Sequence, residues 1–215
     1  MTARPTGPHP TTTAASPGPM PDLATACRPT ASGSVSAARR ALGIPTLFNR
    51  LGPLCNPAPV RFQVAGAPSP ALARTFADVL GRLGVRRGVA MASADGCDEF
   101  SPRAPTAAYT WTAAGRRGRT VHPQTYLARR ERTGPWTPLA PPQAALETER
   151  ILRGGNGARR GAVVLTSGIA LWLAGTAGSV AEGVTKARAV LDDGRAAAAL
   201  AELRELAGPF REASG

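Results

Sequence analysis

Residues 37–66 read AARRALGIPTLFNRLGPLCNPAPVRFQVAG, and they mark the point where patterned sequence begins. The stretch contains two adjacent arginines, a short apolar run at 44–48, a Gly-Pro step at 52–53 and an Asn-Pro step at 56–57. A second apolar segment follows at 62–65. Such glycine and proline punctuation is typical of loops between packed elements. We therefore expect the folded domain to start here.

Upstream of this stretch, residues 1–36 are rich in Pro, Thr, Ser, Ala and Gly and have no helical or strand period. They cannot bury enough apolar surface to offset the entropy of ordering, so we expect a disordered leader. The remainder of the chain divides into a domain at 37–208 and a short tail at 209–215. The leader carries no apolar segment of the length that a signal peptide needs.

Composition limits the classes of function. The 215 residues carry a net charge of +12, but Lys186 is the only lysine, and Ala, Gly and Pro are abundant, as a GC-rich coding sequence would produce. The arginines form scattered pairs, whereas a nucleic-acid surface would gather them on one face. Cys27, Cys55 and Cys97 form no C-x-x-C pair, so neither a disulfide framework nor a zinc site is indicated. These features favour a protein of the reducing cytoplasm.

Immediately downstream, the pattern predicts a strand, a helix and a second strand. Ser69 and Pro70 have the pattern of a helix start, and Leu72, Phe76, Val79, Leu80 and Leu83 recur on one face before Gly84. Strand candidates at 61–65 and 88–93 flank this helix. The unit predicts an α/β fold with a partial parallel or mixed sheet flanked by helices. The second strand leads into Asp-Gly-Cys-Asp-Glu at 95–99, and ligands bind at such strand ends in open sheets.

The rest of the chain is expected to be mainly helical. Residues 102–132 suggest short strands or turns around Tyr109, Trp111, Val121 and Tyr126, and proline-rich residues 133–142 suggest an irregular surface segment. Helices are predicted at 143–152, 162–174, 180–193 and 195–207. Ser179 and Glu182 have the spacing of a capping box, and Leu200, Leu203 and Leu206 are expected to face inward. The glycine- and arginine-rich residues 153–161 are interpreted as a loop between helices.

Seven segments together resemble the C-terminal portion of the anthranilate phosphoribosyltransferases, which form glycosyltransferase family 3 and share a superfamily with pyrimidine nucleoside phosphorylases. The segments are RRALG (39–43), TLFNRLGPLCNP (46–57), QVAG (63–66), LGV (83–85), DGCDEFS (95–101), GTAGSVAEG (175–183) and DG (193–194). The resemblance covers residues 38–207, about four fifths of the chain. FN-x-LGPL-x-NP followed by DG-x-DE-x-S is a specific combination of motifs.

The resemblance implies transfer of a phosphoribosyl group from phosphoribosyl pyrophosphate (PRPP) to anthranilate, in tryptophan biosynthesis. It implies that Asp98 and Glu99 hold Mg²⁺, whose preference for carboxylate and phosphate oxygens suits that role. It also implies that Arg39 contacts the carboxylate of anthranilate, and that Gly52 and Pro53 line the acceptor channel. No residue is assigned to the catalytic step itself.

The chain also departs from the family pattern. The family's helical domain and glycine-rich phosphate loops have no counterpart in 1–36, APPQAALET stands near 143 in place of a GGD-x-x-x-NA start, and Thr166 stands where asparagine is expected. We therefore expect a truncated or diverged member, whose missing half-site a homodimer or a second chain would supply. Two other hypotheses stay open at this point: an inactive, partner-binding remnant and a basic nucleic-acid-binding protein.

Overall fold

The structure, a computed structural model, describes Leu54 and residues 58–212. Its strands are β1 (Phe62–Gly66), β2 (Arg87–Ser93), β3 (Thr106–Thr112) and β4 (Gly115–Val121). Its helices are α4 (Pro70–Arg82), α5 (Pro141–Leu152), α6 (Ala158–Leu173), α7 (Val180–Asp192) and α8 (Arg195–Glu212), with 3₁₀ turns η2 (Pro123–Thr125) and η3 (Arg129–Glu131). The expected leader and the segments at 37–53 and 55–57 lie outside the described residues.

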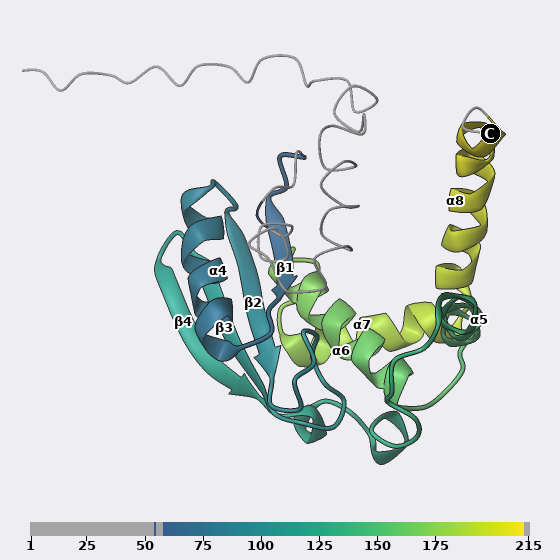
Figure 1. The fold of residues 1–215 in the computed structure, drawn as a ribbon, viewed down its shortest axis with the longest axis horizontal. Helices are drawn as coiled ribbons and strands as arrows, with labels where there is room; N and C mark the ends of the chain where they lie inside the picture. The colour runs from purple at the N-terminus through teal and green to yellow at the C-terminus, as the bar shows by residue number, and fades with distance from the viewer. Residues whose placement is uncertain (1–53, 55–57, 213–215) are drawn as a thin grey trace, which may run out of the picture. The chain divides into compact units, whose positions relative to one another are not determined.

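The four strands form one mixed sheet in the order β1-β2-β3-β4 (Figure 1). β1 and β2 are parallel and joined through α4, while β2, β3 and β4 pair antiparallel. The predicted α/β class and the strand, helix, strand unit are confirmed. β3 and β4 form a hairpin in the region where only short strands or turns were expected.

The start of α4 follows from its sequence. Ser69 is extended, and its hydroxyl accepts a hydrogen bond from the Leu72 N–H at 3.3 Å, which satisfies a free donor of the first turn. Phe76 and Leu80 are buried, as the helical period predicts. The prediction for Leu83 is wrong: it caps the helix and is 60 % exposed, because the buried stripe ends one turn earlier.

Each face of the sheet carries its own apolar cluster. On one face, Phe76 and Leu80 of α4 pack with Ala90 and Trp111 of the sheet. On the other, alternate strand residues such as Val89 and Met91 pack against α6 and α7. Because side chains of a strand alternate between faces, the short segment of β2 serves both clusters. The sheet is therefore covered by helices on both sides.

The C-terminal helices largely follow the prediction, with a few differences. α5 begins at Pro141, two residues before the expected start. α6 begins at Ala158, four residues before the expected start, directly after Gly157 (φ +125°). The Ser179 hydroxyl accepts from the Glu182 N–H at 3.1 Å, but Glu182 accepts from the Gly178 N–H, one residue before the position that a capping box predicts. α8 runs to Glu212, beyond the predicted end at 207.

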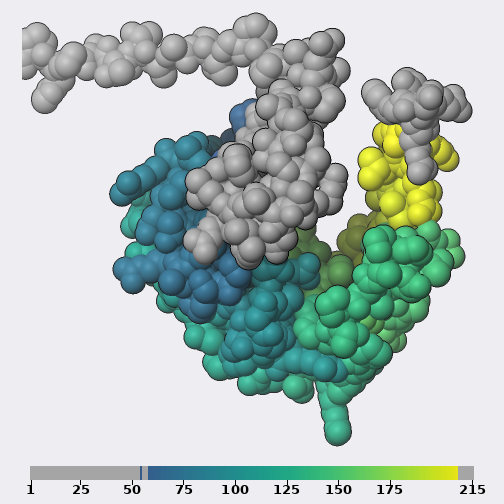
Figure 2. All heavy atoms as spheres, in the orientation of Figure 1, coloured from purple at the N-terminus to yellow at the C-terminus, as the bar shows by residue number. Residues whose placement is uncertain are grey.

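The inward orientation expected for two α8 leucines is wrong. Leu203 and Leu206 are 61 % and 65 % exposed. α8 packs mainly against α7 and α5, and these contacts leave both leucines uncovered. In Figure 2 its yellow atoms project from the green atoms below them. None of the described helices is long and apolar enough to cross a membrane.

Candidate functional site

The loop after β2 carries the DG-x-DE-x-S motif, and its frame is held by internal hydrogen bonds. Asp95 accepts from the Ser101 hydroxyl at 2.7 Å and from the Cys97 N–H at 3.4 Å. Gly96 has φ +81°, a left-handed conformation that glycine adopts without strain. Asp95, Gly96 and Ser101 thus shape the loop, and Asp98 and Glu99 are presented at its tip.

Two residues beneath the loop also hold it, and the motif alone did not point to them. The Ser93 hydroxyl donates to the Glu99 carbonyl at 2.6 Å, lies 2.6 Å from the Thr106 hydroxyl and accepts from the Ser101 N–H at 3.2 Å. Ser93 and Thr106 are buried. The available signal was a serine at the end of the otherwise apolar β2.

Gly66 brings two of the family-like motifs into contact. It ends the QVAG segment, and a Cβ atom at this position would lie 1.8 Å from the carbonyl oxygen of Asp98. No side chain fits in that space, so the backbone of the acidic loop rests directly on the end of β1. The close approach explains in physical terms why glycine stands at this position.

Asp98 and Glu99 lie at a hollow of about 540 Å³ between the ends of β1 and β2 and helix α6. Both side chains are exposed, and neither has a cationic partner among the described residues. Thr166 and Ser167 line the same hollow from α6. The Thr166 hydroxyl is buried and has no hydrogen-bond partner in the described part of the chain, although such groups are normally satisfied.

This donor set fits Mg²⁺, which commonly uses one or two protein carboxylates and completes its shell with water and phosphate oxygens. Residues 58–212 contain no cluster of three or more Asp, Glu, His or Cys side chains suited to a metal. The described residues therefore do not supply a complete set of protein ligands for a metal ion. Two carboxylates beside an open hollow suit a cation shared with an anionic ligand.

A second hollow of about 730 Å³ adjoins the other side of the acidic loop. Trp136, Leu139, Ile151 and Val163 give it an apolar wall, and Asp98 and Glu99 are common to both hollows. The predicted irregular segment at 133–142 ends at residue 140, directly before α5 begins, and its residues Trp136 to Leu139 form one side of this space. Arg159 ties the segment to α6 by donating to the Thr137 carbonyl at 2.7 Å.

Cys97 lies between the carboxylates. Burial, together with the charges of Glu99, Asp95 and Asp98, raises the pKa of its thiol above the ordinary value. A thiol with a raised pKa stays protonated at neutral pH, and the thiolate is the reactive form. Cys97 is thus poorly suited to act as a nucleophile.

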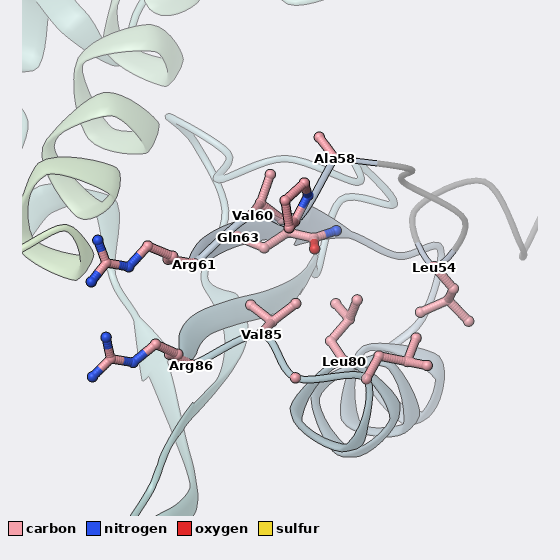
Figure 3. Close-up of a pocket in the computed structure, with 11 residues that line it drawn as sticks. Leu54, Ala58, Val60, Arg61, Gln63, Leu80, Val85 and Arg86 are labelled. Carbon is pink, nitrogen blue, oxygen red and sulfur yellow. The ribbon is translucent and has the colours of Figure 1, made fainter. Parts of the chain in front are cut away.

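The residues implied for the acceptor side, Arg39, Gly52 and Pro53, lie outside the described residues, so their roles stay predictions. The hollow of about 300 Å³ in Figure 3 lies elsewhere. It is lined by Val60 and Val85, which precede β1 and β2, and by Leu80 of α4, whereas the acidic loop follows the end of β2. It takes no part in the candidate site.

Comparison with known proteins identifies the family. A sequence model described as "Glycosyl transferase family, a/b domain" matches residues 23–197. The chain belongs to this family. It is 38% identical over 162 residues to anthranilate phosphoribosyltransferase 2 of Streptomyces coelicolor, covering 75% of this chain and 48% of that protein. It is 39% identical over 176 residues to the anthranilate phosphoribosyltransferase of Pelotomaculum thermopropionicum, covering 82% of this chain and 51% of that protein.

Solved structures show the same relationship. The anthranilate phosphoribosyltransferase of Thermus thermophilus superposes with a TM-score of 0.65 and 30% identity, over 78% of this family member and 50% of that chain. The Saccharomyces cerevisiae enzyme in complex with PRPP and Mg superposes with a TM-score of 0.67 and 25% identity, over 78% of this chain and 49% of that chain. The resemblance inferred from the motifs is confirmed. This chain spans about half the length of the relatives that it matches.

Proposed function

We propose that this chain provides the metal and pyrophosphate side of a phosphoribosyl-transfer site of the anthranilate phosphoribosyltransferase type. The carrying observation is the Asp98–Glu99 pair, unpaired with any cation among residues 58–212 and fixed over Gly66 at the mouth of a hollow. Mg²⁺ held there would neutralise charge that develops on a leaving pyrophosphate group.

The surrounding residues have supporting roles in this proposal. Asp95 and Ser101 fix the loop backbone that carries the two carboxylates, which reduces the reorganisation needed when a ligand binds. The Thr166 hydroxyl supplies a buried donor to the same hollow. A phosphate oxygen or a metal-bound water is a suitable acceptor for it.

PRPP as donor and anthranilate as acceptor are part of the proposal. They are supported by the relatives' names and by the yeast complex with PRPP and Mg. Arg39, Gly52 and Pro53 are proposed to contact the acceptor, and a homodimer or a second chain to complete the site. We also propose a cytoplasmic location. The comparisons favour this function over an inactive remnant or a nucleic-acid-binding protein.

Isothermal titration with PRPP, with and without Mg²⁺ and anthranilate, tests the proposal. We expect Mg²⁺-dependent PRPP binding that D98N/E99Q abolishes, since amide oxygens bind Mg²⁺ far more weakly than carboxylates do. E205Q is the matched control, because Glu205 is an exposed carboxylate on α8, away from the loop. If high concentrations of PRPP and Mg²⁺ produce neither heat of binding nor a thermal shift, the proposal is wrong.

A further inference from the structure

A group of arginines that have no carboxylate partner among the described residues lies at the opposite end of β2 from the acidic loop. Arg61 and Arg86 precede β1 and β2, and the Arg87 N–H donates to the Arg61 carbonyl at 3.3 Å, so the two strand starts are adjacent. Figure 3 shows the Arg61 and Arg86 side chains extending side by side, away from Leu80 and Val85. Neither forms an ion pair with any described carboxylate.

Two further arginines meet at one tryptophan on α6. The guanidinium carbon of Arg87 lies 4.7 Å from the centre of the Trp172 ring, and that of Arg119 lies 5.2 Å from it. Such contacts hold a cation by the charge distribution of the aromatic ring without neutralising it. The Arg87 Nε is buried and has no hydrogen-bond partner in the described part of the chain.

A neighbouring arginine on the opposite face does have a carboxylate partner. Arg116, on the same strand as Arg119 but pointing to the opposite face, has its Nε 2.8 Å from Asp78. Like charges repel when they are held together without a counter-charge, so an anionic partner would relieve the repulsion among Arg61, Arg86, Arg87 and Arg119.

Apolar surface is interleaved with these charges. Phe62 pairs with Arg87 across β1 and β2 and is 43 % exposed. A hollow of about 440 Å³ opens between Phe62, Arg86, Arg87 and Trp111. A small apolar side chain would fit there, beside Arg86 and Arg87.

We propose that this surface, formed by Arg61, Phe62, Arg86, Arg87, Arg119 and Trp172, docks an acidic segment of a partner protein that also presents an apolar anchor. Charge complementarity selects the acidic residues, and the hollow takes the anchor. The apolar hollow argues for a polypeptide over a nucleic acid, whose phosphate backbone offers no such group. The proposal is independent of the transferase site.

The test uses three fluorescent probes on the full chain, at about 0.15 M salt, where exposed charges are largely screened. The first is a short peptide rich in Glu and Asp with two leucines, the second replaces those leucines by serine, and the third is a single-stranded DNA oligonucleotide. We expect the leucine peptide to bind at least about tenfold more tightly than the other two, a difference of about 1.4 kcal/mol.

R61E/R86E should weaken that binding by about tenfold or more, since reversed charges repel the acidic segment. R129E/R130E is the matched control, because it reverses two exposed arginines of η3 and changes the net charge equally. Equal weakening by both variants, tighter binding of the oligonucleotide, or no binding of the leucine peptide overturns the proposal. Concentration-dependent self-association that R61E/R86E abolishes would also overturn it, in favour of a second copy as the occupant.

Discussion

At the scale of single residues, Gly66 is where the fold and the candidate site depend on each other. The G66A Cβ would lie 1.8 Å from a backbone oxygen that cannot rotate away. We expect G66A to displace the acidic loop, to destabilise the protein by about 1–3 kcal/mol and to weaken Mg²⁺-dependent ligand binding. Urea denaturation and calorimetry measure the two effects.

Gly118 of β4 provides the control for G66A. An added Cβ there would meet the ring of Tyr109 at 3.1 Å, and a ring can shift where a backbone carbonyl cannot. G118A should therefore leave ligand binding unchanged. Equal loss of binding in both variants would show that general destabilisation is responsible.

Glu131 is the buried charge on which stability at low pH depends. Burial alone would raise its pKa, but hydrogen bonds from Arg188 at 2.8 and 2.6 Å and from the Ala128 N–H at 3.0 Å lower the pKa below the ordinary value of 4.5. Its contribution is therefore complete above pH 4.5 and is lost as the pH falls through the lowered pKa.

R188M should cost about 3–5 kcal/mol of unfolding free energy at neutral pH, because it leaves Glu131 charged, buried and unpaired. The loss should shrink at low pH, where the carboxyl group is protonated and no longer needs a partner. E131Q should cost less, since Arg188 is 28 % exposed and keeps the Tyr126 carbonyl as an acceptor. Urea denaturation at neutral and acidic pH checks this order, and a cost for R188M that does not depend on pH would contradict it.

At the scale of elements, two glycines allow α6 and α7 to pack closely. A Cβ on Gly183 would lie 2.1 Å from the Gly168 carbonyl oxygen, and one on Gly168 would lie 2.6 Å from the Val184 backbone nitrogen. G183A should force the helices apart and cost about 1–3 kcal/mol. Chemical denaturation measures this cost.

Gly81 of α4 is the matched helical control, because its Cβ would make only an ordinary 3.5 Å contact with Trp111. G81A should stabilise the protein by about 0.5–1 kcal/mol, as alanine is the better helix former. A stabilising G183A would show that the close crossing of α6 and α7 is not required.

At the scale of the whole molecule, local signals predicted the elements better than their packing. Ser69 and Ser179 marked helix starts because a cap acts within three residues. The inward orientation predicted for Leu203 and Leu206 was wrong, because a helical period shows which residues share an apolar face but not whether another element packs against that face. The acidic loop was identifiable from its motif, whereas Ser93 and Thr106 hold that loop through hydrogen bonds to residues outside their own strands.

The same limit explains the arginine surface. Arg87, Arg119 and Trp172 are far apart in the sequence, and only the register of β2, β3 and β4 and the position of α6 bring them together. In the sequence, the arginine pairs are scattered and predict no basic face. The sequence did not predict that Arg87 and Arg119 meet at the Trp172 ring.

The central claim is that Asp98 and Glu99 form a divalent-cation site that serves a pyrophosphate group. Its most direct test is the enhancement of water-proton relaxation by Mn²⁺, titrated with and without inorganic pyrophosphate. We predict that pyrophosphate tightens Mn²⁺ binding to the natural chain, and that D98N/E99Q loses both the binding and the tightening. Mn²⁺ binding that D98N/E99Q leaves unchanged would contradict the account.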